Sequence, residues 1–269
     1  MVMLFSMQVS ASMTMGWYGQ HLSEQGKIIY QGMAESFSRT DLKAAVISGV
    51  EYNDREISDA YQALAFDHPE YGLFEGCGYG WSAASTGNDM ELQVQPSLSA
   101  AQLKRRKSLM KAITRAAAKI RKSSKSTAGR VKAINSYLRK NCSYDYRFKQ
   151  ISFEPYGALC KKKAVCMGYA LAAQALCNEV GITSVVITGK GIDTYGSKEN
   201  HAWNAVKIGK KWYALDITWN DTMGRNCYLM VGQNTRDVLG KAFKKNHKAI
   251  KMQWEVKSIP YPTLSKNKK

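Results

Sequence analysis

A cysteine, a histidine and an aspartate in the second half of the sequence are residue types that together can perform nucleophilic chemistry. Cys166 opens a segment in which apolar residues recur at helical spacing, and Gly181 provides the stop. The thiol therefore lies in the first turn of a predicted helix, where the helix dipole and the lysines at 161–163 favour the thiolate. Because the thiolate is the nucleophilic form, Cys166 is the candidate nucleophile.

His201 and Asp216 lie on two predicted strands, residues 201–208 and 211–218. Gly209 stands between the strands, at the position where a type II′ turn requires glycine. Such a turn joins the two strands into an antiparallel hairpin and fixes how their residues pair.

In this register Ile208 pairs with Lys211 and His201 pairs with Thr218. His201 and Asp216 are then diagonal neighbours on one face, about 7 to 8 Å apart along the backbone and within reach of an imidazole–carboxylate hydrogen bond. A slip of one residue would place them on opposite faces. A carboxylate that holds one imidazole nitrogen leaves the other nitrogen to pair with a thiol, so the sequence predicts a Cys-His-Asp site.

The residues around this site resemble the transglutaminase-like superfamily, in its bacterial and often secreted branch. The likeness extends over residues 128–232, and the three motifs follow one another in the family's order and spacing. They are Ala-Val-Cys-Met-Gly-Tyr-Ala from position 164, His-Ala-Trp-Asn from 201 and Trp-Tyr-Ala-Leu-Asp-Ile-Thr-Trp from 212. The resemblance implies an α+β, papain-like fold in which a helix bearing Cys166 packs on an antiparallel sheet that carries the other two residues. It further implies Cys166 as nucleophile, His201 as general acid/base and Asp216 as the residue that orients His201.

The resemblance also implies an oxyanion donor upstream of the cysteine, which this sequence does not align to one residue. Tyr156 and Tyr144 are the candidates, because a phenol O–H is a competent donor, and packing is the alternative for either. Trp203 and Trp219 are candidates for the wall of the cleft, with core packing as their alternative.

No cofactor or metal is expected at this site. The six cysteines contain no Cys-x-x-Cys pair, which argues against zinc. No acidic cluster suggests calcium. His21, His68 and His247 show no partner at a ligand spacing.

Length and composition describe a globular chain with a large positive charge. The 269 residues are 45% hydrophobic and 10% aromatic, which suffices for a core and excludes disorder throughout. No run of 18 apolar residues predicts a membrane span. The net charge of +18 could attract nucleic acid, an anionic cell surface or acidic protein.

Most of this charge lies in a stretch that has no acidic residue between Glu91 and Asp145. Its apolar residues form two helical stripes, separated by residues 123–127, so two helices with apolar inner and cationic outer faces are expected. The segment 104–132 contains no aromatic residue for base stacking, which argues against nucleic acid. The cations of residues 104–140 are therefore expected to meet an anionic cell-envelope polymer, or else to form a solvated face.

The N-terminal part predicts a small region of its own. Residues 24–66 have a helical pattern, within which 41–50 forms one amphipathic helix. The alternating runs 77–84 and 90–94 predict a β-hairpin. The apolar start, 1–11, ends in small residues and reads as the remnant of a signal peptide, although its basic region is missing; a first buried strand is the alternative.

The expected organisation thus has four parts. They are the signal remnant at 1–11, an accessory helical and β-hairpin region at 12–97, the transglutaminase-like catalytic domain at 98–262 and a basic disordered tail at 263–269.

Three functions are compatible with these observations. The first is thiol-dependent acyl transfer on protein or peptide amides through a thioester, as in glutamine crosslinking or deamidation. The second is a cysteine peptidase or amidase on the same three residues. The third belongs to another class, a non-catalytic basic binding module of the cell surface. The signal remnant favours a secreted or cell-surface location.

Overall fold

The computed structural model describes residues 15–39, 43–51, 53–73, 78–86, 89–193, 196–252 and 255–269. The predicted signal remnant at 1–11 and Cys77 lie outside the described residues. No helix among the described residues is long and apolar enough to cross a membrane.

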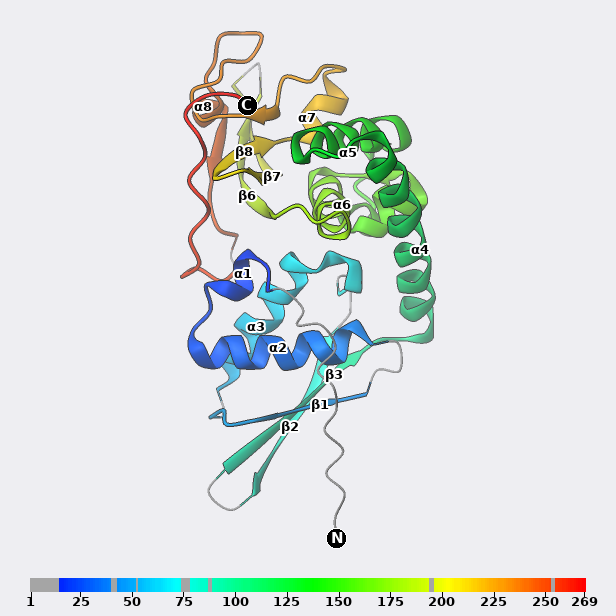
Figure 1. Cartoon of the computed structure of the whole chain (residues 1–269), viewed down its shortest axis with the longest axis vertical. Coiled ribbons are helices and arrows are strands. Elements are labelled where there is room, and N and C mark those ends of the chain that lie inside the picture. The colour runs from blue at the N-terminus through cyan, green and yellow to red at the C-terminus, as the bar shows by residue number, and fades with distance from the viewer. Residues whose placement is uncertain are drawn as a thin grey trace.

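The fold is α+β, as predicted, and is built around a five-stranded antiparallel sheet of order β10-β6-β7-β8-β9. Figure 1 shows helices stacked against this sheet and a second group of elements at the N-terminal end of the molecule. The strands are β6 (Ser184–Ile192), β7 (Lys198–Ile208), β8 (Lys211–Leu215), β9 (Leu229–Val231) and β10 (His247–Ala249).

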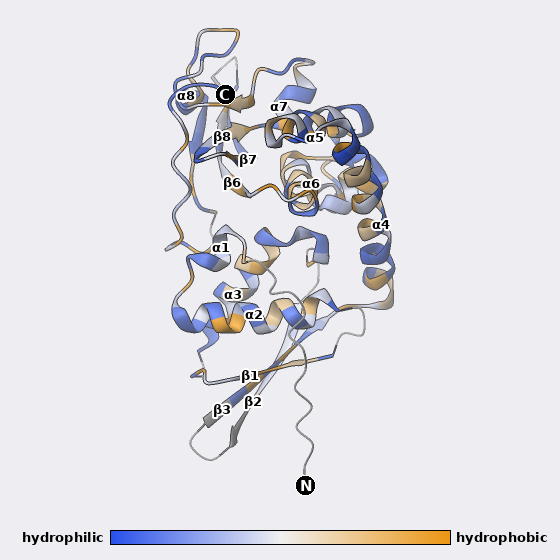
Figure 2. Ribbon diagram, viewed as in Figure 1, coloured by the Kyte–Doolittle hydropathy of each residue, from blue (hydrophilic) through white to orange (hydrophobic). Residues whose placement is uncertain are grey.

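Among the described residues, four helices lie beside the sheet, and the first three of them follow predicted apolar stripes. They are α4 (Ala100–Ser123), α5 (Thr127–Asn141), α6 (Cys166–Glu179) and α7 (Ile217–Thr222). A capping box between Ser99 and Gln102 begins α4, and Ser126 caps α5. The predicted stripe residues are all buried: Leu109, Ile113, Ala116, Ala117, Ile120, Val131, Ile134 and Leu138. Figure 2 shows hydrophilic residues recurring along both helices. Most lysines of the two helices are exposed, which agrees with the predicted cationic outer faces, although Arg106 of α4 is buried.

The N-terminal region contains α1 (Trp17–Gln20), α2 (Glu24–Ser38), α3 (Asp54–Asp67) and a three-stranded sheet of order β1-β3-β2. Its strands are β1 (Ala45–Ser48), β2 (Gly78–Thr86) and β3 (Asp89–Ser97), so the predicted hairpin is confirmed. The predicted helix at 41–50 is wrong. Residues 45–48 alternate buried and exposed, and their backbone pairs with β3, so the period of two prevails over the helical one.

Short elements connect the larger ones. They are η1 (Pro69–Tyr71), β4 (Ser143–Tyr144), η2 (Gln150–Phe153), η3 (Gly157–Lys161), β5 (Lys163–Ala164) and α8 (Phe243–Asn246). The parallel pair β4–β5 leads directly into α6.

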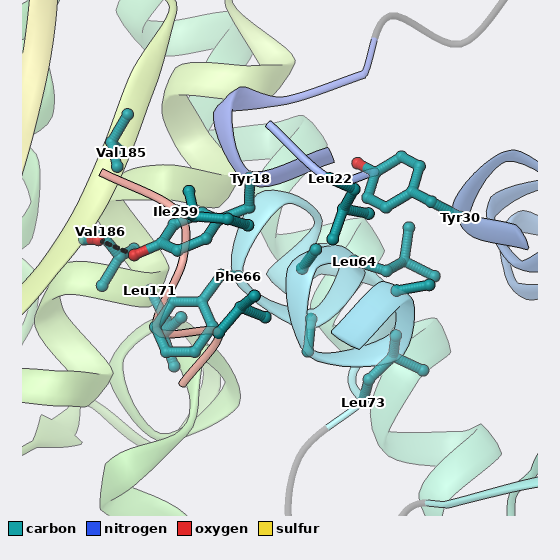
Figure 3. Close-up of a cluster of buried hydrophobic side chains, with 14 of the residues drawn as sticks. Tyr18, Leu22, Tyr30, Leu64, Phe66, Leu73, Leu171, Val185, Val186 and Ile259 are labelled. Carbon is teal, nitrogen blue, oxygen red and sulfur yellow. Dashed lines mark hydrogen bonds between the residues drawn. The ribbon is translucent and has the colours of Figure 1, made fainter. Parts of the chain in front are cut away.

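One hydrophobic cluster joins the N-terminal region to the large sheet. Tyr18 and Phe66 of the accessory region pack with Leu171 of α6 and Val185 of β6, as Figure 3 shows. The Tyr18 hydroxyl also donates a hydrogen bond of 2.8 Å to the carbonyl oxygen of Val186. The predicted accessory region at 12–97 therefore shares its core with the predicted catalytic domain at 98–262.

The C-terminal tail is ordered, which corrects the expectation of disorder at 263–269. The amide of Ser265 donates to the carbonyl of Trp212 at 2.8 Å, and the amide of Lys269 donates to that of Met230 at 3.1 Å. These backbone bonds run along β8 and β9, so the tail covers the end of the sheet although its lysines remain exposed.

Candidate active site

Cys166 is the first residue of α6, as predicted. Val165, the N-cap residue, is extended (φ −94°, ψ 179°), and no side chain caps the helix. Gly168 allows the first turn to approach η2, because a Cβ at this position would lie 2.2 Å from the carbonyl oxygen of Ser152. The Cys166 Sγ is half-buried and lies 4.0 Å from the carbonyl oxygen of Asn200, so the thiol faces the strand that carries His201.

The predicted hairpin register is confirmed where the two strands pair. Ile208 pairs with Lys211, and Gly209 has the positive φ of 60° that the turn requires. The second strand is shorter than predicted, however, since β8 ends at Leu215. Thr218 lies in α7, so it does not pair with His201.

Asp216 lies between β8 and α7 and uses both carboxylate oxygens. Its Oδ1 accepts a hydrogen bond of 3.0 Å from the backbone amide of Trp219 and so caps α7. Its Oδ2 lies 2.8 Å from Nε2 of His201. The predicted contact between His201 and Asp216 therefore forms. The carboxylate is held by its role as the cap of α7, and not by strand pairing as predicted.

Electrostatics favours a charged imidazole at His201. Burial opposes that charge, but the Asp216 carboxylate, its hydrogen bond with the ring and the neighbouring Cys166 outweigh burial and raise the pKa of His201 to about 10. Burial alone would raise the pKa of Asp216, yet the two neighbouring imidazoles hold the pKa of this carboxyl well below its usual range. His201 thus lies between a thiol and an ionised carboxylate, as a proton-transferring base requires.

A second histidine, which was not predicted from the sequence to lie at the site, contacts the same carboxylate. His247 of β10 places its Nε2 3.0 Å from Asp216 Oδ2. Its strand pairs with β6, so His247 is brought to the site by a long-range contact that no residue spacing reports.

The ligand atoms of His201, Asp216 and His247 lie within 4.8 Å of one another, an arrangement that could hold a metal ion. Both Nε2 atoms, however, already bond to one carboxylate oxygen, and the three side chains are at most 2% exposed. A cation would have to replace these hydrogen bonds, so the geometry fits a hydrogen-bonded cluster better than a metal centre.

The two tyrosine candidates lie in different places. Tyr144 pairs with Ala164 in the strand just before Cys166. Burial, followed by the charges of Cys166 and Glu199, raises the pKa of the Tyr144 phenol, which places its hydroxyl in the electrostatic reach of the thiol. Tyr156 instead lies against the start of α4, where it lines a small cavity with Arg105 and Arg106. Of the two candidates, only Tyr144 thus lies beside the start of α6.

The two tryptophan candidates also differ. Trp219 is half-buried, stacks on His201 with ring centroids 4.8 Å apart, and lines a cavity of about 150 Å³. Trp203 is only 2% exposed and packs behind His201, at 5.9 Å between ring centroids. Neither Cys166 nor His201 lines that cavity, so a cleft-wall role for Trp219 stays a prediction, whereas Trp203 belongs to the core.

Part of the chain matches a known protein family. Residues 114–217 match the family model of the transglutaminase-like superfamily. The matched segment contains the cysteine, the histidine and the aspartate. The superfamily supports a thiol-dependent acyltransferase or peptidase in general terms.

The curated relatives cover only part of the chain. Kyphoscoliosis peptidase of Mus musculus is 31% identical over 101 residues, or 34% of this chain and 15% of the relative. The protein of the same name from Homo sapiens is 30% identical over 101 residues, with the same two shares. The match thus spans about 15% of these relatives' length. Among solved structures, one described as a TGase is 16% identical, covers 65% of this chain and 51% of its own, and has a TM-score of 0.37.

Proposed function

We propose that the chain catalyses thiol-dependent acyl transfer on amides of proteins or peptides, through a thioester on Cys166. His201 acts as general acid/base, and Asp216 orients it and stabilises its charged form. The observation that carries this proposal is the position of His201, whose Nε2 lies 2.8 Å from the buried Asp216 carboxylate, next to Asn200, whose carbonyl oxygen lies 4.0 Å from the Cys166 Sγ.

The chemistry follows from these three residues. The Cys166 thiolate attacks the amide carbonyl carbon, and the C–N bond of the resulting tetrahedral intermediate breaks. His201 gives its proton to the departing nitrogen, so a glutamine side chain releases ammonia and leaves a thioester. A second nucleophile then attacks the thioester, His201 takes its proton, and the thiolate leaves.

The negative oxygen of the tetrahedral intermediate needs donors. The amide of Cys166 lies at a helix N-terminus without a side-chain cap, and the Tyr144 hydroxyl is within the electrostatic influence of Cys166. We assign the oxyanion site to these two groups.

The second nucleophile decides the product. An amine such as a lysine side chain gives an isopeptide crosslink, whereas water gives deamidation of glutamine or, on a backbone amide, cleavage. The curated relatives bear the name peptidase, which keeps a cysteine peptidase or amidase on the same residues as the alternative.

One assay separates transfer from hydrolysis. Purified protein is incubated with a glutamine-containing protein and a labelled primary amine, and the products are analysed by mass spectrometry. Amine incorporation that Cys166→Ala abolishes supports transfer, and backbone cleavage without incorporation supports the peptidase. If neither reaction occurs on any amide offered, the proposal is refuted.

Alkylation tests whether Cys166 is activated at all. Cys177 is an internal reference, since it is fully buried and burial raises its pKa to about 12. We expect iodoacetamide to modify Cys166 far faster than Cys177 near neutral pH. Equal rates in native protein would favour the non-catalytic binding module.

A binding role beside catalysis is supported by one row of cations on α4. Exposed cations recur there every three or four residues on one helix face, over roughly 27 Å. They are Lys104, Lys107, Lys111, Arg115, Lys119 and Lys122. We propose that this row binds a linear, phosphate-rich polymer of the cell envelope, which presents charges at regular intervals.

Retention on immobilised polyphosphate checks this surface. Lys111→Glu with Lys119→Glu should elute at lower salt than Lys207→Glu with Lys210→Glu, a matched double reversal on exposed residues of the β7–β8 hairpin. Equal elution of the two variants would refute a specific role for the row.

A secreted or cell-surface location also remains a proposal. N-terminal sequencing of natively produced protein tests it. An end at Met1 with recovery from the cytosol would contradict export.

A further inference from the structure

Two imidazoles share one oxygen of Asp216. Nε2 of His201 lies 2.8 Å from Oδ2 and Nε2 of His247 lies 3.0 Å from the same atom. The other oxygen, Oδ1, accepts the backbone amide of Trp219. All three donors thus point at one carboxylate that is fully buried.

Aromatic packing fixes the ring of His247. Phe243 stacks on it with ring centroids 4.0 Å apart and planes 15° apart. The rings of Trp219 and Trp203 meet it edge-on, at 4.5 and 5.0 Å. With its side chain fully buried, the ring has no room to turn its Nε2 away from Asp216.

A polar chain supports the other side of the ring. Nδ1 of His247 lies 2.8 Å from Oδ1 of Asn246. The Asn246 amide nitrogen donates to Asp237 at 2.8 Å and to the hydroxyl of Tyr228 at 3.2 Å. Both ring nitrogens of His247 thus face acceptor oxygens, and both contacts are hydrogen bonds only when both nitrogens carry a proton; a neutral ring with its proton on Nε2 bonds Asp216 alone.

The two imidazoles differ in their tendency to bind a proton. Burial lowers the pKa of His247 to about 4, although Asp216 and Asp237 act in the raising direction. A neutral ring donates its Nε2–H to Asp216. His201, which also faces Cys166, has its pKa raised despite equal burial. Burial thus opposes a charge on His247, while the acceptor oxygens at both of its ring nitrogens favour one.

A second donor on Oδ2 has a definite effect on His201. Each hydrogen bond to a carboxylate oxygen reduces the negative charge available to other donors, and a cationic donor reduces it further. His247, whether neutral or charged, therefore weakens the interaction between the Asp216 carboxylate and the charged imidazole of His201.

We propose that His247 is a positioning residue that fixes Asp216 between two imidazoles and limits how strongly this carboxylate retains the proton of His201. This role rests on the proposed function, in which His201 must give its proton to the departing nitrogen. A carboxylate with no second donor would hold that proton more tightly and slow its transfer.

The test is a pH titration of ¹⁵N-histidine-labelled full-length protein by NMR, which needs no turnover. The chain has only four histidines, so single replacements assign every imidazole. In His247→Phe, which preserves stacking on Phe243, we expect the His201 midpoint to move upward by about one pH unit. In His247→Gln, whose amide can still donate to Asp216, the shift should be smaller. The alkaline limb of the kcat/KM profile should also move to higher pH, by more in His247→Phe than in His247→Gln.

A folded His247→Phe protein with an unchanged His201 midpoint would overturn the proposal. The wild-type spectrum gives a second test that does not depend on folding of a variant, because His247 must carry its proton on Nε2 at neutral pH. A bare Nε2 there would also overturn it. If the His201 midpoint shifts in His247→Phe but the protein turns over no amide, the role of His247 is upheld and the proposed function fails. Failure of this inference is therefore distinguishable from failure of the proposed function.

Discussion

Trp219 lies flat against His201, with 4.8 Å between the ring centroids and 25° between the ring planes. Gly191 of β6 makes room for this stack. A Cβ at this position would lie 2.8 Å from the Trp219 ring and 3.2 Å from the His201 side chain. The absence of a side chain at residue 191 is thus a condition for the geometry of the candidate base.

Gly191→Ala should therefore lower kcat/KM by about tenfold or more, because small displacements of reacting groups are costly. The loss of stability should stay near 1 kcal/mol, since the flexible edge of the Trp219 ring can move. Gly78→Ala is the matched control, because a Cβ there meets no atom within 4 Å. Equal activity of the two variants would show that the stack does not position His201.

Asp216→Asn separates the charge of the carboxylate from its capping role. The amide oxygen can still accept the Trp219 amide that begins α7, so we expect the protein to remain folded. Loss of the negative charge removes what raises the pKa of His201, so the alkaline limb of the activity profile should move to lower pH. By analogy with other oriented His bases, kcat should fall by roughly 10³ to 10⁴. A kcat within a factor of ten of wild type, measured across the pH range, would remove Asp216 from the mechanism.

The candidate site could be predicted from the sequence because the features that indicate it lie close together along the chain. Apolar periodicity places Cys166 at a helix start, and Gly209 sets the register that brings His201 near Asp216. His247 and the ordered tail could not be predicted in this way, since β10 reaches β6 and the tail reaches Trp212 only through long-range pairing. The strand at 45–48 was missed for the same reason, because its partner β3 decides between two periodicities.

The buried carboxyl of Asp67 should make the free energy of unfolding of the accessory region depend on pH. The carboxylate is buried and accepts hydrogen bonds from the amides of Tyr18 and Gly19. Burial outweighs these bonds and raises its pKa to about 6. Between about pH 4 and pH 6 the folded state therefore binds more protons than the unfolded state, so this group's contribution falls as pH rises, by roughly 3 kcal/mol in all.

Urea unfolding of wild type and Asp67→Asn between pH 4 and 7 measures this contribution. The difference in unfolding free energy between the two proteins should change by that amount across the window and become constant above pH 7. The asparagine can still accept the Tyr18 amide. A difference that does not vary with pH would show that Asp67 is ionised throughout.

Tyr144 and Tyr156 form a matched pair for testing the oxyanion site. Tyr144→Phe removes a hydroxyl in the electrostatic reach of Cys166, and Tyr156→Phe removes one that lies against α4. The first should lower kcat by about 10² to 10³ with little change in KM, because the lost bond forms only in the transition state. The second should leave kcat unchanged. The iodoacetamide reactivity of Cys166 separates this effect from damage to the nucleophile, since alkylation forms no oxyanion and should proceed at a similar rate in both variants. A Tyr144→Phe enzyme with wild-type kcat would mean that backbone amides alone stabilise the intermediate.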